Sequence, residues 1–577
     1  KPYAELNASY GTFNAHKETV KFGTGLLNDH WAFDARLSNI GTDGYIDRAS
    51  VDLYSFYAQG GYFADNTSVK FITFGGKEKT YHAWNYASKE EMEKYGRRFN
   101  SCGMYTDDDG NIRFYKDQTD NYLQMNYQLL LNHTFSPEWN LNAALHYTKG
   151  DGYYQEYKED RTLKEYRLPP FMHDGKEVDK SDLIRQKKMD NHFGGGVFSV
   201  NYQNGKLNAS LGGALNHYDG WHFGRVIWVK NYIGELLPDH EYYRNKAKKT
   251  DGNLYLKANY NLVAGLNAYA DLQYRYINYK INGDNDKFDY NADALQKLAV
   301  NDHFNFFNPK AGLNWDIDAN NRVYASFSIA QKEPTRNNYT DGNADEYPKA
   351  EKLLDYELGY TYRNTWLSAG ANFYYMDYKD QLVLTGELNE IGEAMARNVP
   401  DSYRMGVELM LGVKPCQWFQ WDINGTLSKN RVKNFTEKLY EDEWKNPIEV
   451  SHGNTPIAFS PDLILNNRFS FSYRGFEAAL QSQYVSKQYM SNARQADQTL
   501  DAYFVSNLNL AYTFKLPHVK SVTAGFTIYN IFNAEYENNG YAGSGYKIVK
   551  GEVERYNYAG YAAQAGTNVM GNISIRF

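Results

Sequence analysis

Apolar and polar residues alternate with a period of two along most of the chain, and the last stretch, 567–577, shows the pattern most clearly. One set of alternate positions is mainly apolar and holds Val569, Gly571, Ile573, Ile575 and Phe577. The other set holds Asn568, Met570, Asn572, Ser574 and Arg576. Because successive side chains of a strand point to opposite faces, this stretch predicts a strand with one apolar and one polar face.

Similar runs follow one another from Pro2 onward, and their connections alternate between short and long. Short turns are predicted at 28–29, 65–66, 136–138, 203–205, 261–263, 318–321, 363–364, 414–417, 473–475 and 516–518. Long connections are predicted at 76–121, 153–188, 219–249, 282–302, 332–349, 386–397, 430–455, 487–500 and 533–566. The pattern predicts about 22 strands, with both termini on the short-turn side.

The composition narrows the class of protein. Among 577 residues are 53 Tyr, 31 Phe and 10 Trp, yet the mean hydropathy is -0.70. No stretch approaches the roughly 18 consecutive apolar residues of a transmembrane helix, so a helical membrane protein is excluded. On composition alone, an aromatic-rich secreted β-protein and a large membrane barrel both fit. The net charge of -7 argues against nucleic-acid binding.

The connections favour the barrel. An even series of strands with short turns at one end and long loops at the other is typical of outer-membrane barrels. A final strand that ends on Phe577 without a following turn fits the closing strand of such a barrel. We therefore predict an all-β fold, a transmembrane antiparallel β-barrel of about 22 strands with short periplasmic turns and long extracellular loops.

Aromatic residues and the two cysteines add to this topology. Most tryptophans lie beside the predicted short turns, where an inner girdle is expected: Trp31, Trp139, Trp315, Trp366, Trp418 and Trp421. Tyrosines at the opposite strand ends predict an outer girdle: Tyr57, Tyr147, Tyr279, Tyr378 and Tyr484. Cys102 falls in an outer loop and Cys416 in an inner turn, too far apart for a disulfide. Cys102 is expected to be reachable from outside.

Four stretches carry a resemblance to a known family: Asp-Tyr-Glu-Leu-Gly-Tyr at 355–360 after Lys-Ala-Glu at 349–351, Lys-Glu-Pro-Thr-Arg at 332–336, Ala-Tyr-Phe-Val-Ser-Asn-Leu at 502–508, and Tyr-Asn-Ile-Phe-Asn-Ala-Glu-Tyr at 529–536. Together they resemble the barrel of TonB-dependent outer-membrane receptors. The long loops are most similar in style to siderophore and ferric-chelate receptors of Bacteroidota-like bacteria.

The resemblance implies a location and partners. It places the chain in the outer membrane of a Gram-negative cell, with extracellular loops and periplasmic termini. The family carries an N-terminal plug domain and a box that engages TonB. Neither is found in 1–577, so the whole chain is assigned to one barrel domain. The implied partners are a metal chelate, the TonB–ExbB–ExbD energy-coupling complex acting through the missing N-terminal region, outer-membrane lipid and, as a further candidate, a surface lipoprotein.

Binding is favoured over catalysis, because no phosphate loop, nucleophile elbow or His-Glu-x-x-His motif is found. Aromatic rings beside guanidinium groups suit a flat, anionic metal chelate. The candidate substrate-binding residues are His82, Trp84, Tyr86, Arg97, Arg98, Tyr105, Trp221, His222, Arg336 and Tyr339. For any one of them, loop packing is the competing interpretation. The acidic run 107–110 is interpreted as a solvated loop tip rather than a calcium site.

The predicted function is import of a scarce metal chelate, with a ferric siderophore as the first choice. Haem is the next candidate, with His82, His222 or His452 as ligand, and cobalamin follows. A passive porin-like channel and a barrel enzyme such as a protease or lipase are the rival classes. No catalytic residue, metal site or cofactor is predicted.

Overall fold

The computed structural model describes residues 1–234, 236, 240–290, 292–342, 347–389, 392–441 and 445–577. Its main element is one 23-stranded antiparallel sheet. Of these strands, 22 form a closed barrel wall, and β22 (Lys445–Pro456) pairs only with the outer part of its neighbour. The predicted fold class is confirmed.

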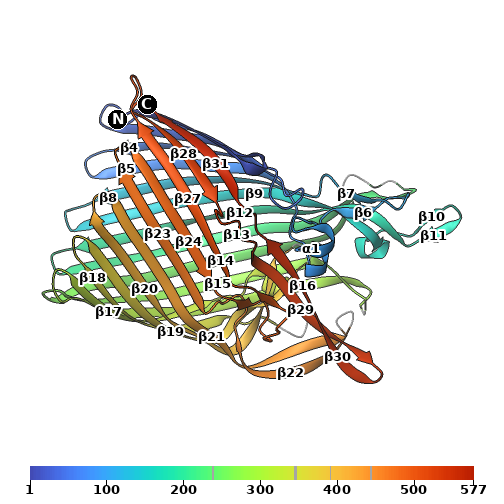
Figure 1. Cartoon of the computed structure of the whole chain (residues 1–577). Coiled ribbons are helices and arrows are strands. Elements are labelled where there is room, and N and C mark those ends of the chain that lie inside the picture. The colour runs from blue at the N-terminus through green and yellow to red at the C-terminus, as the bar shows by residue number, and fades with distance from the viewer. Residues whose placement is uncertain (235, 237–239, 291, 343–346, 390–391, 442–444) are drawn as a thin grey trace.

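The wall strands follow the chain in order around the barrel (Figure 1). They are β1 (Tyr3–Gly11), β2 (Ala15–Gly23), β3 (Trp31–Thr42), β4 (Val51–Phe63), β5 (Thr67–Tyr81), β8 (Thr119–Thr134), β9 (Trp139–Thr162), β12 (Lys180–Gln203), β13 (Leu207–Val229), β14 (Glu241–Val263), β15 (Leu266–Asp289), β16 (Ala294–Asp316), β17 (Asn321–Lys332), β18 (Glu351–Arg363), β19 (Leu367–Leu388), β20 (Ala394–Cys416), β21 (Phe419–Glu441), β23 (Leu463–Tyr473), β24 (Phe476–Val485), β27 (Tyr503–Phe514), β28 (Ser521–Tyr529) and β31 (Asn568–Arg576).

The first and last wall strands close the barrel. Glu5 of β1 pairs with Arg576 of β31, and Leu6 pairs with Ile575. The Phe577 amide donates to the Ala4 carbonyl at 2.9 Å. Closure satisfies the backbone groups that an open sheet edge would leave unpaired in lipid. The termini lie together at the short-turn end (Figure 1), as predicted.

Tight turns join the strands at that end. The turn after Tyr473 has positive φ at Arg474 (47°) and Gly475 (84°), the geometry of a type I′ hairpin. Tyr473 then pairs directly with Phe476. The predicted tryptophan girdle is confirmed at this end, where Trp139, among others, is 46% exposed. Outward positions above it are apolar, such as Leu145, which is 62% exposed.

The outer ends differ from the sequence prediction. The predicted connection 153–188 consists largely of strand. Here β9 and β12 stay paired along their whole length, from Tyr202 opposite Trp139 at the short-turn end to Lys180 opposite Thr162 at the outer end. The same is true of 219–249 and 282–302 within the described residues. Beyond the membrane neither face of a strand must be apolar, so these extensions lack the alternation that marks the wall. Parts of the predicted connections, at 235, 237–239, 291, 343–346, 390–391 and 442–444, lie outside the described residues.

Small elements cover the outer mouth. They are α1 (Lys89–Tyr95), the β6–β7 hairpin (Met104–Thr106, Ile112–Phe114), the β10–β11 hairpin (Phe171–His173, Lys176–Val178), α2 (Arg336–Thr340), β25–β26 (Gln488–Tyr489, Thr499–Leu500), and the β29–β30 hairpin (Glu537–Val549, Glu552–Ala563); two 3₁₀ turns, η1 (Thr12–Asn14) and η2 (Leu163–Tyr166), complete the set. In the described part of the chain, no helix is long and apolar enough to cross a membrane.

Two predictions about side chains need correction. Tyr147 and Tyr484 face outward, but Tyr57, Tyr279 and Tyr378 pair with lumen-facing positions and do not belong to an outer girdle.

Both cysteines are free thiols, as expected. Cys102, however, is only 2% exposed, so it is not reachable from outside as the sequence suggested.

Candidate functional site

The first group of predicted residues lies in the loop between β5 and β8. The ring of His82 stacks on Trp84 with centroids 3.8 Å apart, and Tyr154 meets both rings edge-on at 6.0 Å. His82 is 2% exposed, and burial lowers its pKa to about 4. The imidazole is therefore neutral at pH 7 and forms part of a packed aromatic cluster.

The two arginines of this loop are engaged by other outer segments. Arg97 pairs with Glu537 at 2.5 Å and donates to the carbonyl of Tyr536 at 3.2 Å. Arg98 pairs with Asp47 at 3.3 Å and donates from Nε to a loop carbonyl at 2.7 Å. Their charges are thus used to join the loop to its neighbours.

The tyrosines of the same loop also pack on protein. Tyr86 stacks with Tyr541 of β29 at 6.4 Å, and Tyr105 stacks with Tyr157 of β9 at 4.3 Å. The acidic run 107–110 forms the tip of the β6–β7 hairpin. There Asp107 accepts the amides of the turn and pairs with Arg113 at 2.8 Å.

The pair Trp221–His222 is divided between the two faces of β13. Trp221 lies on the outward face with Leu211 and Leu215, which are 45% and 63% exposed. His222 points into the lumen, and its Nε2 is buried without a hydrogen-bond partner in the described part of the chain. Because successive side chains of a strand point to opposite faces, Trp221 faces away from the lumen and His222 faces into it.

The helix α2 brings Arg336 and Tyr339 to the same lumen wall as His222. The helix begins with a reciprocal cap between Thr335 and Asn338. Arg336 donates from Nη2 to the side-chain oxygen of Asn245 at 2.7 Å, and Asn245 is the direct cross-strand neighbour of His222.

The environment of Arg336 is the most distinctive feature of the site. Its Nη1 is buried and has no hydrogen-bond partner among the described residues. Burial also lowers the pKa of the guanidinium. Tyr339 packs edge-on against Tyr279 at 5.7 Å and donates its hydroxyl to Asp302 at 2.7 Å. We call Tyr218, His222, Tyr279, Arg336 and Tyr339 the lumen cluster.

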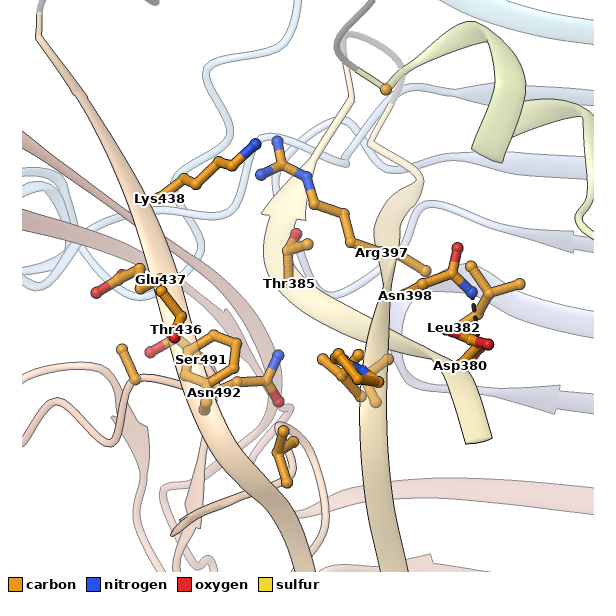
Figure 2. Close-up of a pocket in the computed structure, with 18 of the residues that line it drawn as sticks. Asp380, Leu382, Thr385, Arg397, Asn398, Thr436, Glu437, Lys438, Ser491 and Asn492 are labelled. Atoms are coloured by element: carbon orange, nitrogen blue, oxygen red, sulfur yellow. Dashed lines mark hydrogen bonds between the residues drawn. The ribbon is translucent and has the colours of Figure 1, made fainter. Parts of the chain in front are cut away.

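Sequence reasoning missed a cavity of about 570 Å³ beside this cluster, between the outer parts of β19, β20 and β21 and the segment 491–493 (Figure 2). Arg397 and Lys438 reach toward one another across it, and Leu382 with Val432 supplies apolar surface. Its lining comes from several connections far apart in sequence, so no local motif could have indicated it.

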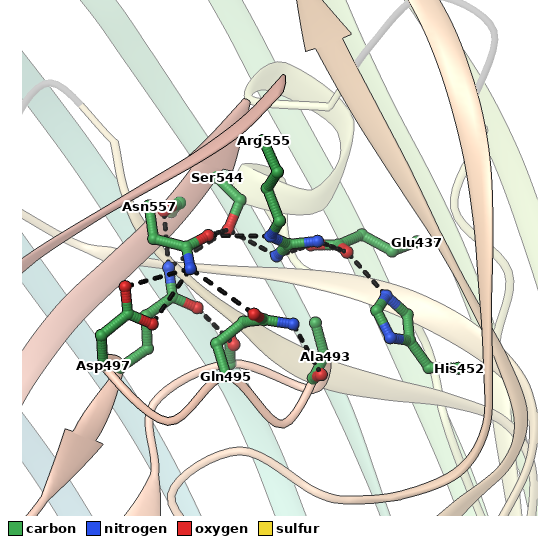
Figure 3. A network of polar contacts seen from close by, with 11 residues as sticks. Glu437, His452, Ala493, Gln495, Asp497, Ser544, Arg555 and Asn557 are labelled. Atoms are coloured by element: carbon green, nitrogen blue, oxygen red, sulfur yellow. Dashed lines mark hydrogen bonds and ion pairs between the residues drawn. The ribbon is translucent and has the colours of Figure 1, made fainter. Parts of the chain in front are cut away.

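A polar network borders the cavity and fixes the β29–β30 hairpin (Figure 3). Arg555 donates to both carboxylate oxygens of Glu437, at 2.6 and 3.0 Å, and His452 contacts the same carboxylate at 2.8 Å. At its other side the hairpin bonds to the β5–β8 loop, where the Tyr561 amide donates to Ala87 at 2.8 Å. The hairpin therefore links two separate parts of the outer rim.

The fold and the comparisons now identify the family. The family model described as "TonB dependent receptor-like, beta-barrel" matches residues 73–531. The chain belongs to this family. TonB-dependent receptor barrels lie in the outer membrane of Gram-negative cells, and this location holds for the chain.

Relatives of this TonB-dependent receptor barrel include the pesticin receptor of Yersinia enterocolitica, which is 24% identical over 225 residues. That match spans 38% of the chain and 30% of the receptor's length. This source, like the Yersinia and Acinetobacter sources of two of the solved structures below, does not support the resemblance to Bacteroidota receptors.

Three solved structures share the fold over the whole chain. They are the ferric yersiniabactin uptake receptor FyuA from Yersinia pestis (TM-score 0.69, 13% identity, 80% of that chain), the siderophore receptor PiuA from Acinetobacter baumannii (0.72, 12%, 82%) and the copper transporter OprC (0.71, 13%, 81%). At these identities they show the fold alone.

Proposed function

We propose that this receptor imports a scarce metal chelate, with a ferric siderophore as the preferred class. The observation that carries the proposal is the buried Nη1 of Arg336, which has no partner in the described part of the chain. A guanidinium is costly to bury unless an anion meets it. A ligand that presents catecholate or carboxylate oxygens would complete its hydrogen bonds.

The rest of the lumen cluster suits the same ligand. Tyr218 and Tyr279 lie close enough to Arg336 to influence its pKa, and His222 is adjacent through Asn245. Aromatic faces stack on flat chelating groups, and the guanidinium pairs with their charge. We propose Arg336, Tyr339 and His222 as the main binding residues. A binding role for the predicted loop residues His82 to Tyr105, whose side chains pack on protein, stays a prediction.

Energy coupling is part of the proposal. We infer that a plug domain occupies the lumen and that the TonB–ExbB–ExbD complex acts on it through an N-terminal region. The fold relatives, which include siderophore receptors and a copper transporter, support a metal-containing cargo. A surface lipoprotein remains a further candidate partner.

Haem is the second candidate, because the Nε2 of lumen-facing His222, which has no hydrogen-bond partner among the described residues, is a suitable iron ligand and Arg336 would pair with a propionate. His452 is less suited, since Glu437 already contacts its Nε2 at 2.8 Å. A His222→Gln substitution distinguishes the two candidates. It should abolish growth on haem but only weaken growth on a ferric siderophore.

The deciding experiment is growth of a deletion strain on single iron sources, namely ferric siderophores or haem, and on cobalamin. We expect loss of growth on one ferric chelate, restored by the wild-type gene and not by Arg336→Met. Normal growth on every source would contradict chelate import and favour a passive channel.

A further inference from the structure

A buried ionic network adjoins the lumen cluster at the point where the chain leaves β17 and enters α2. Glu333 lies in this connection and is 6% exposed. Its carboxylate accepts hydrogen bonds from Nη1 and Nη2 of Arg275 at 3.0 and 3.1 Å, and it also pairs with Lys249. The Nε of Arg275 donates to both carboxylate oxygens of Asp251 at 3.1 Å. Glu333 is therefore tied to strands β14 and β15 of the lumen wall.

The charges of this network compensate one another. Its two cations and its two carboxylates lie within ion-pair distance of one another. A carboxylate as buried as that of Glu333 is stable only where cations and hydrogen bonds meet it, so breaking these contacts is costly. Arg336 differs from the two cations of the network, because its Nη1 has no hydrogen-bond partner among the described residues.

The backbone between Glu333 and Arg336 has little conformational freedom. Pro334 fixes its own φ and restricts the residue before it to extended conformations. Thr335 then caps the helix through its reciprocal bonds with Asn338. Because this short connection is stiff, a movement of Glu333 displaces Arg336, the first residue of α2.

The helix α2 depends on anchors of this kind for its position. It has 5 residues, and a helix of this length is not stable by itself in water. On its far side Asn338 donates to a carbonyl of β20 at a long 3.4 Å, and Asn337 bonds to an exposed carboxylate of the β19–β20 connection. Arg336 and Tyr339 bond to the wall at 2.7 Å each, but both are proposed to bind the ligand. Glu333 therefore supplies the buried ionic anchor that fixes α2 to the wall.

We propose that Glu333 is a positioning residue for ligand binding. By bridging Lys249 and Arg275 it holds α2 against the lumen wall and directs the guanidinium of Arg336 toward the anionic oxygens of the chelate. Its carboxylate acts through Arg336 and does not contact the ligand, because the network takes up its own hydrogen bonds. Hydrogen bonds weaken steeply when the donor is displaced or tilted, so a small shift of α2 is enough to weaken binding. This inference rests on the proposed function, since it concerns how the same site is built.

The competing explanation is a purely electrostatic role, in which the negative charge of Glu333 acts on the ligand directly. A Glu333→Asp substitution separates the two roles, because aspartate keeps the charge but is shorter by a methylene group. The shorter side chain cannot bridge both cations while α2 stays in place. Either the helix shifts or one ion pair is lost, whereas the charge near the ligand is unchanged.

The test uses the full receptor, purified in detergent. We expect amide hydrogen exchange of 336–341 in the ligand-free Glu333→Asp variant to be roughly tenfold faster than in the wild type, since α2 opens more easily. Titration calorimetry with the ferric siderophore that supports growth should show roughly fivefold weaker binding by this variant. In an Arg336→Met background the Glu333→Asp substitution should weaken binding no further, because the group that it positions is absent.

Glu437 provides a matched control. This glutamate also contacts two basic side chains, Arg555 and His452, but it anchors the β29–β30 hairpin instead of α2. A Glu437→Asp substitution should speed up hydrogen exchange in that hairpin and leave both the exchange of α2 and the affinity for the siderophore unchanged.

Unchanged exchange of 336–341 in Glu333→Asp would overturn the inference. So would unchanged affinity, the same loss of affinity in the Arg336→Met background, or an equal loss in the Glu437→Asp control. A wild-type receptor that binds no ferric siderophore would contradict the proposed function, and this inference with it. The two failures are distinguishable, because the first appears only in the variants and the second already in the wild type.

Discussion

The loop between β5 and β8 and the lumen cluster contain the same residue types but use them differently. In the loop, Arg97 is paired with Glu537 and Arg98 with Asp47. In the lumen cluster, Arg336 keeps a buried Nη1 without a partner in the described residues. The difference lies in the partners: Arg97 and Arg98 hold the loops together, whereas we propose that Arg336, whose Nη1 has no partner in the described residues, is kept for a ligand.

The reason for the difference is structural. A long loop outside the membrane has no barrel core beneath it, so it must build its own from residues such as His82, Trp84 and Cys102. The lumen cluster stands on strands that are already fixed by cross-strand hydrogen bonds. Its side chains can therefore remain incompletely satisfied without loss of the fold.

The largest predicted effect concerns His82. Its folded-state pKa is about 4, below the ordinary value of 6.5, so the open loop binds more protons between these pH values. The closed loop should therefore become less stable relative to the open loop, by roughly 3 kcal/mol, as the pH drops from 6.5 to 4. Hydrogen exchange of the segment 82–118, corrected for intrinsic rates, measures this. A His82→Phe substitution should remove most of this pH dependence of loop opening. If the variant showed the same pH dependence as the wild type, His82 would not be its cause.

The second prediction tests whether Arg336 is kept for a ligand. Replacing it by Met removes a buried charge that lacks full pairing, so the free energy of unfolding should rise by roughly 1 kcal/mol. Urea unfolding in phospholipid vesicles gives this value. A decrease of similar size would instead make Arg336 a structural residue like Arg97, and the contrast between the two regions would fail.

The third prediction concerns the pair Arg97–Glu537, whose side chains are 27% and 20% exposed. A double-mutant cycle with Arg97→Gln and Glu537→Gln should give a coupling free energy of about 1 kcal/mol, measured by hydrogen exchange of the β29–β30 hairpin. Chelate affinity should be unaffected by either change. If Arg97→Gln greatly weakened chelate binding but left the hydrogen-exchange protection of the β29–β30 hairpin unchanged, Arg97 would be a ligand-binding residue instead.

The smallest expected effect is the absence of a reaction at Cys102. Burial raises the pKa of its thiol to about 11, and the thiolate is the reactive form. A membrane-impermeant maleimide should not label Cys102 on intact cells but should label an Asp109→Cys variant, whose position is exposed at the hairpin tip. Rapid labelling of Cys102 would show that the loop does not form the packed core described here.

The sequence predicts the wall far better than the outer mouth. Alternation and turn residues reveal elements such as β31 and the turn at Arg474–Gly475, because lipid on one side and a wet lumen on the other impose a period of two. Above the membrane this constraint ends, so the sequence pattern predicts a loop where the structure has the outer part of β9. Contacts such as Glu437 with Arg555 join residues far apart in the chain and leave no local signal.

The most direct measurement is the affinity of the purified receptor for the ferric chelate that supports growth, compared between Arg336→Met and Arg98→Met. Both variants lose one guanidinium from the outer end. The account predicts that the first weakens binding roughly thirtyfold, about 2 kcal/mol, while the second stays within roughly twofold of the wild type. Equal effects, or a larger loss at Arg98, would contradict a binding site in the lumen cluster.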